Sequence, residues 1–138
     1  MKLKRLFITG GHFMPAQAVI EELQKRGGPP AGEAGWEIFY LGRKQAMEDD
    51  HAEALEYQVI RQLPGVTYLI LTTGRIQPKF FVNFGQSVKA FLKIFLGLWQ
   101  ALFLVLRYQP DVVLSFGGYM AVPVVFWAYL LGIPSATH

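Results

Sequence analysis

The sequence has no cysteine, which excludes a disulfide framework and a metal site built from thiolates. It also has no lysine in the Walker position after a glycine loop, and no Gly-x-Ser-x-Gly elbow. These absences remove the main sequence support for nucleotide hydrolysis and for serine-esterase chemistry. The acidic residues 48–50 and His51 are consecutive, and consecutive residues of a helix point in different directions. We therefore expect no metal site and no cofactor.

Charge is scarce as well. Only 17% of the 138 residues are charged, whereas 52% are hydrophobic, which predicts a surface that faces a membrane or a partner. The net charge of +3 and the pI near 9.3 suit phosphates, anionic lipid headgroups or nucleic acid, without choosing among them. The length suits one domain, and the apolar run at residues 6–8 is too short for the core of a signal peptide.

Strand-like and helix-like segments alternate along the chain. Helical patterns open at Pro15, in the charged residues 43–63, in the apolar residues 79–107 and at Pro123. This alternation predicts an α/β fold, a Rossmann-like parallel sheet with helices on both faces, in which ligands bind at the carboxyl ends of the strands. The predicted strands are residues 3–9, 36–41, 66–72, 111–115 and 133–138.

Two glycine turns follow predicted strands at that edge of the sheet. The first reads Thr-Gly-Gly-His at residues 9–12, and the second reads Phe-Gly-Gly-Tyr at residues 116–119. Glycines let backbone N–H groups approach an anion, and the helix start after the first turn adds partial positive charge. His12 could exchange a proton with a hydroxyl or a phosphate, and Tyr119 could share its pocket. A purely conformational role for the turns stays open, as does a surface role for the cations near other strand ends, which are Arg43, Lys44, Arg75 and Lys79.

Residues 79–107 form the most apolar segment of the chain. Between Ile94 and Leu106 the one polar residue is Gln100, and this run is shorter than the roughly 20 residues that cross a bilayer. Three interpretations stay open: a transmembrane helix, a core helix under the sheet, and a helix with an aromatic face in the membrane interface beside lysines. The residues expected to dock on a membrane are Phe80, Phe81, Phe84, Lys89, Lys93, Phe95 and Trp99.

Together these motifs resemble the N-terminal acceptor domain of the MurG family of glycosyltransferases, within glycosyltransferase family 28. The most specific stretch is Pro-Asp-Val-Val-Leu-Ser-Phe-Gly-Gly-Tyr at residues 110–119, and the likeness covers nearly the whole chain. The resemblance implies the N-terminal half of a GT-B fold. It implies that residues 1–138 are a single, incomplete domain for acceptor binding and membrane docking, with the C-terminal donor-binding domain absent from them.

The resemblance also implies an activity. Members of the family transfer GlcNAc from UDP-GlcNAc to a muramoyl-pentapeptide linked through diphosphate to undecaprenol, for peptidoglycan synthesis at the cytoplasmic face of the membrane, with no role for nucleic acid. By this likeness His12 is the general base. The residues expected to bind the acceptor diphosphate are Thr9, Gly10, Gly11, Gly117, Gly118, Tyr119 and Arg75.

Two departures from the family pattern shape these expectations. The family's first loop usually reads Gly-Gly-Thr-Gly-Gly-His, and the loop here is shorter. UDP-GlcNAc would need a C-terminal domain or a partner chain, so residues 1–138 alone are expected to be inactive. Two alternatives remain: a non-catalytic subunit that recruits a donor-binding chain to the membrane, as in a two-chain GlcNAc transferase, and a soluble nucleotide-binding Rossmann domain.

Overall fold

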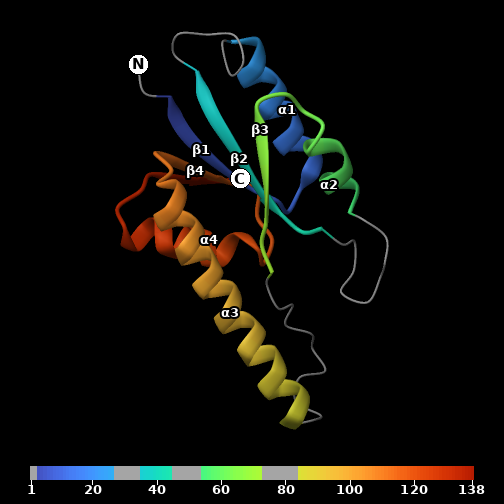
Figure 1. The fold of residues 1–138 in the computed structure, drawn as a ribbon, viewed down its shortest axis with the longest axis vertical. Helices are drawn as coiled ribbons and strands as arrows, with labels where there is room; N and C mark the ends of the chain where they lie inside the picture. Colours follow the sequence, from blue (N-terminus) through green and yellow to red (C-terminus); the bar gives the residue numbers. More distant parts are fainter. Residues whose placement is uncertain (1–2, 27–34, 45–53, 73–83) are drawn as a thin grey trace.

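The computed structural model describes residues 3–26, 35–44, 54–72 and 84–138, which form a five-stranded sheet with helices on both faces (Figure 1). All the strand pairings are parallel, so the predicted Rossmann-like α/β fold is confirmed. In chain order the elements are β1 (Lys4–Thr9), α1 (Phe13–Lys25), β2 (Trp36–Gly42), α2 (Leu55–Ile60), β3 (Val66–Ile70), α3 (Phe84–Tyr108), β4 (Val112–Ser115), α4 (Ala121–Leu130) and β5 (Ser135–Thr137).

The strand order β3-β2-β1-β4-β5 places β1 at the centre of the sheet. The chain adds β2 and β3 on one side of β1 and then returns to add β4 and β5 on the other. In the pairing of β1 with β4, Thr9 lies opposite Ser115, so the two strands end level with each other. The strand order therefore reverses between β1 and β4, and open α/β sheets bind their ligands at this position.

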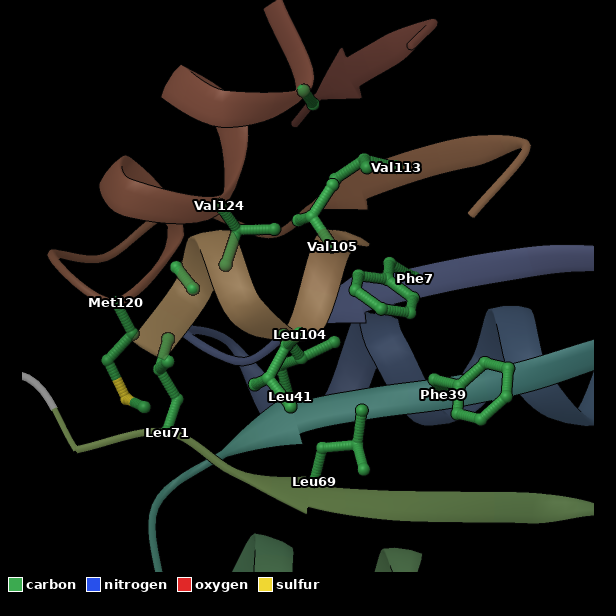
Figure 2. Packing of buried hydrophobic residues seen from close by; sticks show 12 residues of the cluster. Phe7, Phe39, Leu41, Leu69, Leu71, Leu104, Val105, Val113, Met120 and Val124 are labelled. Carbon is green, nitrogen blue, oxygen red and sulfur yellow. The ribbon is translucent and has the colours of Figure 1, made fainter. Parts of the chain in front are cut away.

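Two hydrophobic cores lie on opposite faces of the sheet, because alternate residues of a strand point to opposite sides. From β1, Leu6 and Ile8 pack with Ala16 and Ile20 of α1, whereas Phe7 points toward α3 and α4. Burial on both faces holds β1 in place and so fixes the start of the turn that follows it. Figure 2 shows the second core, where strand residues meet α3 and the start of α4 through Phe39, Leu41, Leu69, Leu104, Val105, Met120 and Val124.

Helix α3 has two halves with different surroundings. In the C-terminal half, Ala101, Leu104 and Val105 are buried against the sheet, whereas the N-terminal half extends beyond the sheet (Figure 1). The 18-residue window Phe91–Tyr108 has a mean hydropathy of 1.5, and by length and composition it could span a membrane. Only 17% of this window is buried, whereas a core helix would be mostly buried. The predicted core helix is therefore confirmed for the C-terminal half alone. The exposed apolar residues from Val88 to Trp99 are Val88, Phe91, Leu92, Ile94, Phe95, Leu96 and Trp99.

The polar Gln100 marks the boundary between these halves. Its Nε2 donates to the Ile70 carbonyl at 2.9 Å, and its Oε1 accepts from the Thr72 N–H at 2.8 Å. The side chain thus continues the hydrogen bonding of the sheet at the end of β3. Since Gln100 and the buried C-terminal half bind α3 to the sheet, the apolar window could cross a bilayer only by leaving that core.

Several element boundaries differ from the predicted ones. Helix α1 begins at Phe13, so Pro15 lies inside the first turn, where its missing N–H costs nothing. Helix α4 begins at Ala121, before the predicted start at Pro123. Of the charged segment predicted to be helical, α2 (Leu55–Ile60) is the described helix, and residues 45–53 lie outside the described part.

Candidate functional site

The first glycine turn connects β1 to α1. The Gly10 N–H donates to the Leu41 carbonyl at 2.8 Å, which ties the turn to the end of β2. Gly11 packs so closely that an added Cβ would lie 2.7 Å from the Phe116 carbonyl oxygen. His12 precedes α1 and makes no capping hydrogen bond to it through its side chain. The first N–H groups of α1 therefore stay free of this cap and can face an anion.

The second glycine turn connects β4 to α4 and lies directly against the first. Gly117 and Gly118 both have φ of +78°, in the left-handed region. The Phe116 N–H donates to the Thr9 carbonyl at 3.4 Å, and a Cβ on Gly118 would lie 3.3 Å from the Gly11 Cα. The two turns are thus in contact where the strand order reverses, as expected from the sequence.

The imidazole of His12 is oriented by the second turn. Its Nδ1 lies 3.0 Å from the Phe116 carbonyl oxygen. Because a carbonyl oxygen can only accept a hydrogen bond, Nδ1 carries the proton and donates it, and Nε2 of the neutral ring keeps its lone pair. The side chain is exposed. Nε2 of His12 can therefore accept a proton from a group bound in front of the two turns.

Two buried hydroxyls, on Thr9 and Ser115, lie at the ends of the paired strands β1 and β4. The Ser115 Oγ accepts from the Gly117 N–H at 3.2 Å and so helps to hold the second turn. The Thr9 Oγ1 has no hydrogen-bond partner in the part of the chain that the structure describes. A buried hydroxyl without a partner is uncommon in folded proteins, and it is consistent with a polar group bound at this edge.

Arg43 joins the end of β2 to the second turn. Its Nη1 donates to the Tyr119 hydroxyl at 2.9 Å, and the guanidinium carbon is 5.6 Å from the centre of the Tyr119 ring. The Arg43 backbone is held on both sides: its N–H donates to Glu56 Oε1 at 3.3 Å, and its carbonyl accepts from the Tyr68 hydroxyl at 2.8 Å. The Tyr40 hydroxyl donates to Oε2 of Glu56 at 3.3 Å.

The two tyrosines of this network are held in the protonated form. Burial, followed by the charge of the Glu56 carboxylate, raises the pKa of both Tyr40 and Tyr68 well above the ordinary value of a phenol. Both hydroxyls are therefore hydrogen-bond donors at neutral pH. Their chemical role is to position Glu56 and the Arg43 backbone beside the glycine turns.

Several predicted site residues lie at this one edge of the sheet, and others lie elsewhere. On α3, the exposed fractions of Phe95 and Trp99 are 56% and 65%. Lys89 and Lys93 are exposed on the same helix, and Phe84 is its first residue. Arg75, Phe80 and Phe81 lie outside the described residues. The residues that the structure brings together are Thr9, Gly10, Gly11, His12, Gly117, Gly118 and Tyr119.

Sequence reasoning missed most of the network beside the turns. It left Arg43 among several possible cations, and it gave no role to Tyr40, Glu56 or Tyr68. For Arg43 a signal was present, because it directly follows a strand that ends at the ligand edge. The pairing of Tyr40 with Tyr68 depends on the register of β2 against β3, and no local motif encodes that register.

The fold and this edge define a Rossmann-like domain of the class that binds ligands at the carboxyl ends of its strands. Within that class, a match to the N-terminal domain of one family identifies the family of this chain. The chain belongs to glycosyltransferase family 28, whose N-terminal domain matches residues 9–138. The family expected from the sequence is therefore confirmed.

The curated relatives of the chain are much longer than the chain itself. A protein of Geobacillus kaustophilus named UDP-N-acetylglucosamine–N-acetylmuramyl-(pentapeptide) pyrophosphoryl-undecaprenol N-acetylglucosamine transferase is 34% identical over 98% of the chain. A protein of Actinobacillus pleuropneumoniae with the same name is 37% identical over 94% of the chain. The chain spans about a third of these relatives, 34% of the first and 31% of the second.

Solved structures agree on the fold. MurG of Acinetobacter baumannii superimposes with a TM-score of 0.65 and 23% identity, over 98% of this chain and 34% of that one. The UDP-GlcNAc 2-epimerase of Neisseria meningitidis, solved with UDP-GlcNAc bound, gives a TM-score of 0.54 and 17% identity, over 98% of this chain and 32% of that one. The fold of the chain is therefore that of the N-terminal half of a GT-B glycosyltransferase.

Proposed function

We propose that this chain is the acceptor-binding part of a GlcNAc transferase that acts on a lipid-linked muramoyl-pentapeptide in peptidoglycan synthesis. The observation that carries this proposal is the contact between the two glycine turns, with His12 oriented by the Phe116 carbonyl at 3.0 Å. The names of the relatives in family 28 support the choice of acceptor and of UDP-GlcNAc as donor. The donor would be supplied by residues beyond this domain or by a partner chain.

In the proposed reaction the acceptor diphosphate lies against the two turns, near Thr9 and the start of α1. His12 Nε2 accepts the proton of the acceptor hydroxyl as that oxygen attacks the anomeric carbon of GlcNAc. The new carbon–oxygen bond forms while the bond to UDP breaks, and UDP leaves with the electron pair, so the anomeric configuration inverts. The proton held at Nδ1 keeps Nε2 as the basic nitrogen throughout.

A transfer assay tests this role of His12. The chain is fused to the donor domain of a family relative, and transfer of labelled GlcNAc to the lipid-linked acceptor is measured. We expect His12→Ala to lower turnover by about 100-fold or more, since general bases contribute 10²–10⁴-fold. His51→Ala is the matched control and should keep full turnover. If His12→Ala raises KM alone, His12 binds the acceptor and does not act as the base.

The proposal includes docking at the cytoplasmic face of the membrane through the N-terminal half of α3. The support is the exposure of apolar side chains, with Phe91 at 69%, Leu96 at 63% and Trp99 at 65%. Exposed Lys89 and Lys93 lie beside them, and α3 has no acidic residue to repel anionic lipid headgroups. Such a helix favours the interfacial interpretation of the sequence.

Vesicle flotation tests the docking surface. Replacing Phe95 and Trp99 by serine should abolish most binding of the chain to vesicles that contain phosphatidylglycerol. Leu55→Ser is the matched control, because Leu55 is 65% exposed at the start of α2, on the other face of the sheet. Equal binding by the double variant and the control would contradict docking through α3, and would favour the alternative of a soluble nucleotide-binding domain.

A further inference from the structure

We propose that Arg43 is a binding residue for the acceptor diphosphate and forms, with Tyr119, the wall of the site beside β2. This inference rests on the proposed function and adds a residue and a specificity to it. The motifs that carry the resemblance to the family do not include Arg43, and the reasons for choosing it come from its surroundings. They concern its backbone, its guanidinium and its position between the two turns.

The backbone of Arg43 is fixed at the ligand edge. Its N–H donates to Glu56 at 3.3 Å, and its carbonyl accepts from the Tyr68 hydroxyl at 2.8 Å. Glu56 also reaches the first turn, because its Oε2 would lie 3.2 Å from a Cβ on Gly10. Glu56 therefore connects the Arg43 backbone to the first turn, which would bind the phosphates. Because its backbone is already fixed, Arg43 loses little backbone conformational entropy when a ligand binds.

The guanidinium of Arg43 is oriented by Tyr119, and this hydrogen bond uses only one of its N–H donors. Nη1 donates to the Tyr119 hydroxyl at 2.9 Å, and the ring of Tyr119 lies 5.6 Å from the guanidinium carbon. The Nε is buried and has no hydrogen-bond partner in the part of the chain that the structure describes, so the Nη groups are the donors that a ligand could reach. Within the same part, neither of the two ion pairs involves Arg43. Among the described residues, the hydrogen bond between Glu56 and Arg43 involves the backbone N–H of Arg43 and not its guanidinium.

A diphosphate is the ligand chemistry that fits these donors. A partly buried guanidinium without a carboxylate partner is costly, and an anion offsets that cost. The planar fork of arginine matches the paired oxygens of phosphate groups, so it selects a diphosphate over a single compact charge. Because Tyr119 follows Gly118 directly, the Arg43 side chain extends from the end of β2 to the second turn. A diphosphate lying against both turns would then be within its reach.

The test compares binding to vesicles that differ only in their anionic lipid. Neutral phosphatidylcholine vesicles carry undecaprenyl diphosphate, undecaprenyl monophosphate or phosphatidylglycerol, and binding of the 138-residue chain is measured at fixed salt. We expect Arg43→Gln to weaken binding to the diphosphate vesicles by about 10-fold or more, as loss of charge-assisted hydrogen bonds does. Binding to phosphatidylglycerol vesicles should not change. Arg43→Lys should recover only part of the loss, because it restores the charge without the fork.

Lys44→Gln is the matched control, because Lys44 is the exposed neighbour and the change removes the same charge. Its effect should be small and equal for all three lipids. An Arg43→Gln variant that matches Lys44→Gln, while the unaltered chain still prefers the diphosphate, would overturn the role of Arg43 and leave the proposed function standing. No preference for diphosphate in the unaltered chain would instead contradict the proposed function. Thermal unfolding of each variant checks that it is folded.

A diphosphate also occurs in UDP, so a second arm separates the two sources. UDP is titrated into the unaltered chain and into Arg43→Gln, and binding is followed by calorimetry. The proposal expects UDP affinity to be equally weak in both. If Arg43→Gln loses affinity for UDP but keeps its affinity for undecaprenyl diphosphate, Arg43 belongs to the donor side and the assignment to the acceptor is wrong.

Discussion

The two glycine turns at the ligand edge share the same Gly-Gly pair, yet they need glycine for different reasons. In the first turn, φ of Gly10 and Gly11 lies outside the left-handed region, so their conformations are open to other residues. What Gly11 lacks is room, because a Cβ there would meet the backbone of Gly117 and of Phe116. The first turn is thus constrained by its neighbour.

The second turn is constrained by its own backbone. Gly117 and Gly118 both have φ of +78°, which L side chains rarely adopt. Around Gly117 there is space, since among the described residues, its chain neighbours aside, the nearest atom to an added Cβ is the His138 carbonyl oxygen at 4.0 Å. The left-handed residues of the second turn bring its backbone against Gly11. There is room for that backbone because Gly11 has no Cβ. The comparison shows that one short motif can encode two halves of a single interlocked contact.

The largest expected effect is that of Gly11→Ala. The added Cβ would collide with backbone atoms on the other turn, which cannot rotate away as a side chain would. We expect a loss of about 3 kcal/mol in the free energy of unfolding, at the upper end of overpacking costs. Urea unfolding followed by circular dichroism measures it. Gly132→Ala is the control for backbone conformation alone, because Gly132 has φ of +69° and, apart from its chain neighbours, no described residue lies within 4 Å of its Cβ position. Equal losses in the two variants would contradict the interlocked contact.

Next in size are alanine substitutions in the second turn. Gly118→Ala should cost about 2 kcal/mol, because it combines left-handed strain with a contact to the Gly11 Cα at 3.3 Å. Gly117→Ala should cost about 1 kcal/mol, since strain acts there without crowding. Gly117→Asn should recover part of that loss, because asparagine tolerates the left-handed region. The same unfolding measurement ranks the three variants, and a Gly117→Ala cost above that of Gly118→Ala would contradict this account.

The sequence carried enough information for the fold and for the meeting of the turns. The strand before each Gly-Gly pair is a short apolar run, and parallel strands end at one edge, so the approach of His12 to the residues around Gly117 followed from topology alone. The structure adds the reason for the orientation of His12, which is the Phe116 carbonyl. That detail depends on the backbone path of the second turn, and hydrophobic periodicity carries no information on it.

The two halves of α3 could not be separated from the sequence. Both halves are apolar, so periodicity gave the same signal for the buried Val105 and for the exposed Phe95. What separates them is the length of the sheet, which ends before the helix does. Gln100 marked the boundary as the one polar residue of the run, but its partners on Ile70 and Thr72 come from a strand distant in the chain.

A smaller effect is expected for Gly10→Ala, which tests the other residue of the first turn. Its Cβ would lie 3.0 Å from the Tyr40 hydroxyl and 3.2 Å from Glu56 Oε2, and both are ends of side chains. These groups can shift by a few tenths of an ångström, so the cost should be about 0.5–1 kcal/mol, below the usual overpacking range. Combining Gly10→Ala with Tyr40→Phe should reduce this cost, because the crowding oxygen is then gone. A double variant no better than Gly10→Ala would place the crowding elsewhere.

The smallest effect concerns pH and the phenol of Tyr40, which lies beside Gly10 of the first turn. Burial raises the pKa of Tyr40, so the folded chain holds that proton more tightly than the unfolded chain does. The resulting stability is complete well below pH 10 and begins to fall as the pH approaches the unfolded-state pKa near 10, by at most about 0.4 kcal/mol at pH 10 for this one phenol. Tyr40→Phe should remove this part of the decline. Tyr129→Phe is the matched control, because it removes a phenol that is 80% exposed. Unfolding measured at pH 8, 9 and 10 decides the matter, and a decline of equal slope in both variants would mean that the phenol of Tyr40 does not cause this part of the pH dependence.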